Sequence, residues 1–168
     1  MELHSQRLVL REFRQSDYQA VREYENNPEI HRYEKEVIPA DSATHAYIDE
    51  ALTWSQENPR TRYRLAITLP ADDIVLGRIS LTLNFSEIRE WEIGWTLHFD
   101  YWGNGYASEA AKTMLAFAFE ELHAHRVVAF CNVMNMRSEG VMKKIGMQQD
   151  GRLRETRWVT PACWPSFR

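Results

Sequence analysis

Apolar residues in the first third of the chain change from strand spacing to helical spacing. A first strand is predicted within residues 2–13, and a helix that Ser16-Asp17 can cap follows it to about Asn26. Residues 28–39 show no regular pattern. A second helix is predicted from Asp41 or Ser42, and the Asn58-Pro59 pair ends it, because the residue before a proline avoids the helical conformation.

The pattern then alternates, as is typical of strands. Three strands of an antiparallel meander are predicted at residues 63–69, 74–85 and 90–99, and Gly77 in the second indicates a possible bulge. After the meander the order becomes helix, strand, helix, strand. These last elements are predicted at residues 108–122, 126–131, 137–145 and 147–158, with Gly146 as the stop of the second helix. The pattern therefore predicts an α+β fold that ends in one crossover unit.

Composition indicates a single domain over residues 1–168, because 44% hydrophobic and 26% charged residues are ordinary for a globular protein of this length. No apolar run reaches the ~18 residues of a membrane span, and from residues 1–4 we expect no cleaved secretory signal. The two cysteines, Cys131 and Cys163, exclude a disulfide scaffold, so we expect a cytoplasmic protein. We interpret Cys131 as a buried core thiol. The formal charge of −4 argues against nonspecific nucleic-acid binding.

The clearest chemical signal is the segment Tyr101-Trp102-Gly103-Asn104-Gly105-Tyr106-Ala107-Ser108, which lies between a predicted strand and a predicted helix. Small residues leave the backbone N–H groups uncovered, and the helix adds its positive end, so the segment can bind a phosphate or a pyrophosphate. The alternative is a glycine-containing structural turn. The segment fits neither a Walker loop, which needs Lys and Ser or Thr after its last glycine, nor a dinucleotide fingerprint, which needs Gly or Ala in the place of Ser108.

Several motifs in one order resemble the GNAT N-acetyltransferases, in the branch similar to the ribosomal-protein-alanine N-acetyltransferases. They are Arg7-Leu8-Val9-Leu10-Arg11, Trp91-Glu92-Ile93-Gly94-Trp95-Thr96-Leu97, the glycine loop, and the stretch from Asn135-Met136-Arg137-Ser138 to Gly146-Met147. The resemblance covers residues 7–158. It implies a mixed, mostly antiparallel sheet of six or seven strands flanked by about four helices. It also implies acetyl-CoA as co-substrate and an amine as acceptor, either a peptide N-terminus or a small molecule.

The resemblance also assigns residues to the co-substrate. It implies that backbone amides from Gly103, Asn104, Gly105, Tyr106, Ala107 and Ser108 hold the pyrophosphate. The strand edge near Leu97 and Phe99 would pair with the pantetheine arm, and Asn135 would contact that arm. Trp102 stands where the loop pattern begins with Arg or Gln, although an aromatic residue is common there in this branch.

Acetyl transfer needs a neutral amine and a proton for the departing thiolate. Glu92 is the candidate base, with His98 and Glu155 in reserve, and a solvated strand glutamate is the alternative for Glu92. Ser138 is the candidate acid, whereas its alternative role is to cap the following helix while Asn135 makes a turn. A backbone N–H on the Leu97 strand is the expected donor to the oxyanion.

The end of the chain departs from the resembled pattern. Two prolines in residues 159–168 make a normal seventh strand hard to build. The last strand would then pair directly with residues 126–131, or a partner chain would fill the gap, which makes a homodimer possible. No metal is expected, because His123 and His125 lack further ligands in a zinc spacing. The sequence thus predicts an acetyl-CoA-dependent N-acetyltransferase, and the alternative is a non-catalytic acyl-CoA-binding domain with a degenerate acceptor site.

Overall fold

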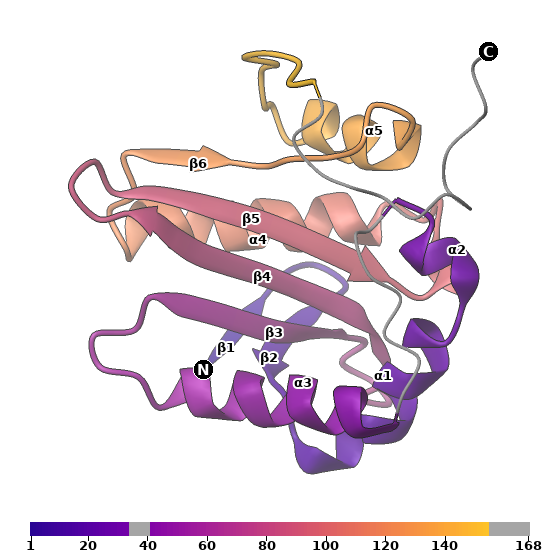
Figure 1. Cartoon of the computed structure of the whole chain (residues 1–168). Coiled ribbons are helices and arrows are strands. Elements are labelled where there is room, and N and C mark those ends of the chain that lie inside the picture. The colour runs from indigo at the N-terminus through magenta and orange to yellow at the C-terminus, as the bar shows by residue number, and fades with distance from the viewer. Residues whose placement is uncertain (34–40, 155–168) are drawn as a thin grey trace.

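The computed structural model describes residues 1–33 and 41–154, which form a curled six-stranded sheet with helices on both faces (Figure 1). The strands are β1 (Glu2–His4), β2 (Val9–Glu12), β3 (Arg62–Thr68), β4 (Val75–Phe85), β5 (Glu90–Leu97) and β6 (Arg126–Val128). They lie side by side in chain order. All neighbours are antiparallel except β5 and β6, which are parallel.

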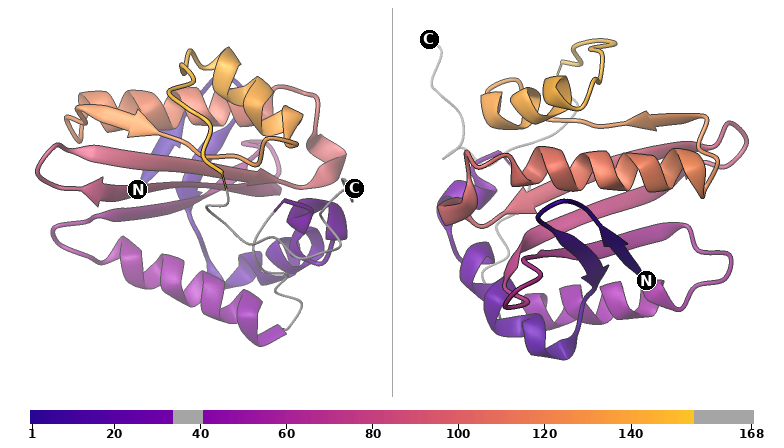
Figure 2. Two further views of the ribbon diagram at one scale, coloured as in Figure 1. Left: turned by 45° about the horizontal axis from the view of Figure 1, so that its top comes forward. Right: turned by 180° about the vertical axis from the view of Figure 1, so that it is seen from behind.

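Five α-helices belong to the described part of the chain: α1 (Tyr18–Glu25), α2 (Pro28–His31), α3 (Asp41–Ser55), α4 (Tyr106–Glu120) and α5 (Met136–Lys144). Helix α4 covers one face of the sheet, and α1 and α3 cover the other (Figures 1 and 2). The longer helices and the meander strands confirm the predicted α+β class. None of the described helices has the length and apolar character that crossing a membrane requires.

The alternation of the strands divides the core into two clusters. Leu65, Ile79 and Ile93 point toward α4 and pack with its Met114. The opposite cluster lies under α1 and α3 and includes Phe13, Val21, Tyr24, Ile48 and Ala51, all at most 2% exposed. Burial of apolar surface on both faces therefore fixes which side of each strand faces which helix.

The N-terminal region differs from the prediction in detail. Residues 2–13 form a hairpin of two short strands, because residues 5–8 make a turn in which the N–H of Ser5 donates to the carbonyl of Leu8. Residues 28–31, predicted to be irregular, form α2, which the Asn27 side chain caps. Asp17 precedes α1 as predicted, but its carboxylate pairs with buried Arg11 rather than with the helix.

The C-terminal region departs further from the prediction. The strand predicted at 126–131 stops at Val128, and the described part of the predicted last strand, residues 147–154, contains no strand. A strand needs a neighbour to satisfy its backbone groups, and β6 offers only three residues. The expected pairing of this segment with residues 126–131 is therefore wrong for residues 147–154. Residues 155–158 and the tail at 159–168 lie outside the described residues.

The predicted irregularity at Gly77 is confirmed. Ile67 pairs with Gly77 and Thr68 with Val75, so Leu76 is an extra residue on β4. A Cβ atom at Gly77 would lie inside contact distance of the backbone of β5, at Thr96 and Leu97. The bulge thus brings two backbones together at the end of β5 where the candidate site begins.

Candidate functional site

The parallel pair β5–β6 opens into a cleft. The two strands pair over only three positions, ending at Glu92 and Val128, whereas β5 continues to Leu97. Beyond Glu92, the β5 edge therefore has no neighbouring strand in the described part of the chain. The cleft that begins there has a volume of ≈ 2610 Å³ and extends to α5 and the start of α4.

Two hydrogen bonds show which peptide groups face this cleft. At the start of β5 the carbonyl of Arg89 accepts from the His125 N–H on the β6 side, 3.1 Å away. Beyond its end the His98 N–H donates to the carbonyl of Leu76 on the β4 side, at 2.7 Å. Peptide groups of an extended strand alternate between its two edges, so those of Leu97 and of every second residue before it face the cleft.

Most of the predicted site residues line this one cleft. They are Glu92, Leu97, Gly103, Gly105, Tyr106, Ala107, Ser108, Asn135 and Ser138. Phe99 and Asn104 do not line it. Phe99 begins a 3-10 turn, Phe99–Tyr101, and its ring stacks on His98 at a centroid distance of 4.3 Å. Glu155 lies outside the described residues.

The glycine loop leads into α4 through two glycines in a left-handed backbone conformation. Gly103 and Gly105 both have φ of 81°, a left-handed conformation that side chains disfavour, and Gly105 is the N-cap of α4. The amide of Asn104 donates back to the carbonyls of Tyr101 and Trp102, at 3.3 and 3.2 Å. The side chain thus holds the loop, and the start of α4 meets the cleft with its N–H groups.

A contact that the sequence did not reveal ties the loop to the N-terminal hairpin. Glu109, in the first turn of α4, accepts from the Arg7 guanidinium, from the Arg7 backbone N–H at 2.7 Å and from Ser5 Oγ at 2.8 Å. Arg7 Nη1 also donates to the Asn104 carbonyl at 3.1 Å, and its Cζ lies 4.6 Å from the centre of the Tyr106 ring. We call Ser5, Arg7 and Glu109 the clamp.

Electrostatics within the clamp favour the ionised carboxylate. Burial raises the pKa of Glu109, but the hydrogen bonds from Ser5 and Arg7 outweigh burial, so the net pKa is lowered. The negative charge near the loop is therefore neutralised by Arg7 at neutral pH. No local pattern could have identified the pair, since the two residues are 102 positions apart.

The start of α5 shows that the alternative role of Ser138, as the cap of this helix, is wrong. Asn135, not Ser138, caps this helix: the Asn135 side-chain oxygen accepts from the Ser138 N–H at 3.1 Å. The hydroxyl of half-buried Ser138 is therefore not occupied as a cap. The NH₂ group of Asn135 is likewise not used by the capping bond, and both residues border the cleft.

Glu92 lies on β5 between Trp91 and Ile93, which belong to the α4-facing core, so it points to the opposite face of the sheet. It is half-buried, and its carboxylate accepts from the Asn84 amide at 3.2 Å. Arg78 and Ser80 of β4 border the cleft as well. The surroundings of Glu92 are therefore polar rather than apolar.

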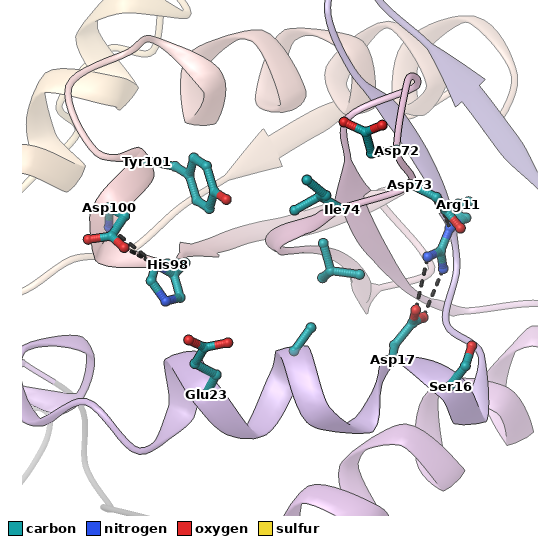
Figure 3. Close-up of a pocket in the computed structure, with 12 residues that line it drawn as sticks. Arg11, Ser16, Asp17, Glu23, Asp72, Asp73, Ile74, His98, Asp100 and Tyr101 are labelled. Carbon is teal, nitrogen blue, oxygen red and sulfur yellow. Dashed lines mark hydrogen bonds and ion pairs between the residues drawn. The ribbon is translucent and has the colours of Figure 1, made fainter.

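His98 belongs to a second pocket of ≈ 470 Å³ (Figure 3). Its Nδ1 accepts from the Asp100 N–H at 3.2 Å, and Glu23 and Asp72 are further lining residues. The structure thus does not bring the reserve base His98 together with Glu92 in the cleft.

Two other predicted features concern cysteine and metal chemistry. Cys131 is exposed, so its interpretation as a buried core thiol is wrong; β6 stops at Val128 and does not carry it into the core. Residues 1–33 and 41–154 contain no group of three or more His, Cys, Asp or Glu side chains that could hold a metal ion.

Comparison with known proteins agrees with this geometry. Residues 7–148 match the family described as "Acetyltransferase (GNAT) domain". The uncharacterized N-acetyltransferase YnaD of Bacillus subtilis (strain 168) is 34% identical over 90% of this chain and 85% of its own length. A GNAT-family acetyltransferase from Bacillus anthracis superposes with a TM-score of 0.80 at 31% identity, over 90% of this chain and 86% of that one. RimJ of Mycobacterium smegmatis, solved in complex with CoA-disulfide, shares the fold at 18% identity, with a TM-score of 0.79 over 91% and 76% of the two chains.

Proposed function

This chain belongs to the GNAT acetyltransferase family, and we propose that it transfers the acetyl group of acetyl-CoA to a primary amine. The acceptor is a protein N-terminal amine or a small-molecule amine. One observation carries the proposal: the glycine loop at the start of α4 and the unpaired edge of β5 border the same cleft. An anion site and a row of free peptide groups are what a coenzyme with a diphosphate and an amide-containing arm requires.

The residues of the cleft fit acetyl-CoA part by part. The amides between Gly103 and Ser108 suit the diphosphate, because the two glycines leave the loop backbone uncovered and α4 adds its positive end. The cleft-facing peptide groups of Ile93 and Trp95, together with the Leu97 N–H, suit the pantetheine arm as an added strand, whereas the Leu97 carbonyl already accepts from Trp102 Nε1. Asn135 can donate to the same arm through its free NH₂ group.

Transfer would proceed by direct attack in a ternary complex. The neutral amine attacks the thioester carbon, a C–N bond forms and the C–S bond breaks, and the thiolate leaves with a proton. Glu92 would take the proton from the incoming ammonium, directly or through water. Ser138 would give a proton to the sulfur and regain one from the amine nitrogen, which loses its second proton as the amide forms. A cleft-facing N–H on the Leu97 strand would stabilise the oxyanion.

The test combines binding with transfer. The protein is incubated with isotopically labelled acetyl-CoA and a mixture of amines and peptides, and thiol release and labelled products are measured. We expect acceptor-dependent thiol release. Tight acetyl-CoA binding without it would favour the alternative, a non-catalytic acyl-CoA-binding domain.

A matched pair of variants tests the position of the coenzyme. Gly105→Glu should abolish acetyl-CoA binding by placing bulk and negative charge in the diphosphate site. Gly146→Glu is the control, because Gly146 has a similar φ of 86°, is exposed and does not line the cleft. Unchanged affinity in Gly105→Glu, or equal loss in both variants, would refute the assigned site.

A further inference from the structure

Arg137, the second residue of α5, lines the same cleft as the glycine loop. Its Cζ atom lies 4.4 Å from the centre of the Trp102 ring. That ring is itself fixed, because Trp102 Nε1 donates to the carbonyl of Leu97 at 2.8 Å. Since Trp102 directly precedes Gly103, the stacking holds a guanidinium at the residue before the first glycine of the loop.

The donors of Arg137 are not used elsewhere in the described part of the chain. Arg137 is exposed, and no hydrogen bond or ion pair to its guanidinium occurs within residues 1–33 and 41–154. The acidic residue nearest to it on α5, Glu139, pairs with Lys143 at 2.5 Å. Stacking on an aromatic face leaves the in-plane N–H groups of an arginine free to bind an anion.

We propose that Arg137, held from the α5 side against Trp102, binds the diphosphate of acetyl-CoA together with the loop amides; this inference rests on the proposed function. The loop offers neutral N–H donors, and the charge of Arg7 is already balanced by Glu109. Arg137 adds the unbalanced positive charge, in the planar geometry that suits two phosphate oxygens. Trp102, which replaces the Arg or Gln of the resembled loop pattern, thereby presents a guanidinium supplied by another element.

The test measures dissociation constants of Arg137→Ala for three ligands: CoA, 3′-dephospho-CoA, and S-acetylpantetheine, which lacks phosphates. Calorimetry serves the first two and an NMR titration the third. We expect a loss of about tenfold or more for both phosphorylated ligands and no change for S-acetylpantetheine. Lys112→Ala is the control, because it removes an exposed positive charge from α4 outside the cleft.

Three outcomes would overturn the proposal. Unchanged CoA affinity would show that Arg137 does not bind the coenzyme. A loss confined to CoA, with 3′-dephospho-CoA unaffected, would place the contact at the 3′-phosphate. An equal loss for S-acetylpantetheine would indicate a change in the cleft rather than a lost phosphate contact. If the unaltered protein bound none of the three ligands, the proposed function itself would fail, so the two failures are distinguishable.

The role of stacking has its own test. Arg137→Lys keeps the charge but loses the planar fork, so we expect affinity between those of the unaltered protein and Arg137→Ala. In a Trp102→Leu background the guanidinium has no aromatic ring to stack on. Arg137→Ala should then reduce CoA affinity clearly less than it does in the unaltered protein. Equal losses in both backgrounds would contradict positioning by Trp102.

Discussion

The clamp leads to a specific prediction, because the carboxylate of Glu109 joins α4 to the N-terminal hairpin. In Glu109→Gln the side chain keeps its size but loses its charge and one of two accepting oxygens. Oε1 of Glu109 accepts from Ser5 Oγ and from the Arg7 N–H, and Oε2 accepts from Nε and Nη2 of Arg7. A glutamine amide can satisfy only one of these two sets, and its NH₂ group then faces donors.

The expected cost follows from burial. The Glu109 side chain is 17% exposed, whereas Arg7 is 44% exposed and can be hydrated when its partner is lost. Hydrogen bonds to charged groups contribute about 1.5–3 kcal/mol each. Because Arg7 can be hydrated, we expect Glu109→Gln to lower the free energy of unfolding by only about 2 kcal/mol. In a protein of this size that lowers the melting temperature by about 4–8 °C.

Urea unfolding followed by circular dichroism measures this change at pH 7. Glu120→Gln is the control, since Glu120 lies exposed at the far end of α4, and we expect an effect within about 0.5 kcal/mol. Because the pKa of Glu109 is lowered in the folded state, its contribution is complete above the ordinary glutamate pKa and is lost as the pH falls through the folded value. The difference between the two proteins should therefore shrink on acidification. A variant as stable as the unaltered protein at pH 7, or a difference independent of pH, would refute the clamp.

Three further predictions concern other parts of the fold. Gly77→Ala should cost about 3 kcal/mol or more in urea unfolding, because its Cβ meets the carbonyl of Thr96 and the two backbones must move apart. Asp17→Asn should cost about 3–5 kcal/mol, because Arg11 is left buried with part of its charge unpaired; an unchanged unfolding midpoint would contradict this. Asn135→Ala should lose the cap and about 1 kcal/mol of unfolding free energy, whereas the neutral Asn135→Ser should keep the cap, so weaker CoA binding in the serine variant would report the loss of the NH₂ contact.

Local features of the site were predictable from the sequence. Gly103 and Gly105 lie at loop positions with a left-handed backbone, which glycine adopts without a steric penalty. A strand and a helix flank the loop, as the apolar spacing indicated. The bulge at Gly77 was predictable for a similar reason: a glycine inside a strand often marks a bulge or a close approach of two backbones. In each case the information lies within about ten residues.

Features that depend on distant partners were not predictable. The pairing of Arg7 with Glu109 and the stacking of Arg137 on Trp102 join segments that only the fold brings together. Alternation over residues 147–154 was compatible with a strand, but a strand also needs a partner, and β6 is too short to provide one. The exchange of Asn135 for Ser138 as the cap is a shift of three residues, and helix boundaries are the least certain part of any pattern.

An acidic chain repels a polyanionic coenzyme, so its binding site needs positive charge or hydrogen-bond donors of its own. The formal net charge is −4, and Glu109 lies in the first turn of the very helix whose N-terminus faces the cleft. Arg7 neutralises the charge of Glu109, so the pair as a whole contributes no net positive charge to the site. The backbone amides donate hydrogen bonds but carry no net charge. Among the described residues that we assign to this site, only Arg137, stacked on Trp102, adds a positive charge that no carboxylate balances. Affinity for the diphosphate should therefore respond strongly to salt in the unaltered protein and less in Arg137→Ala.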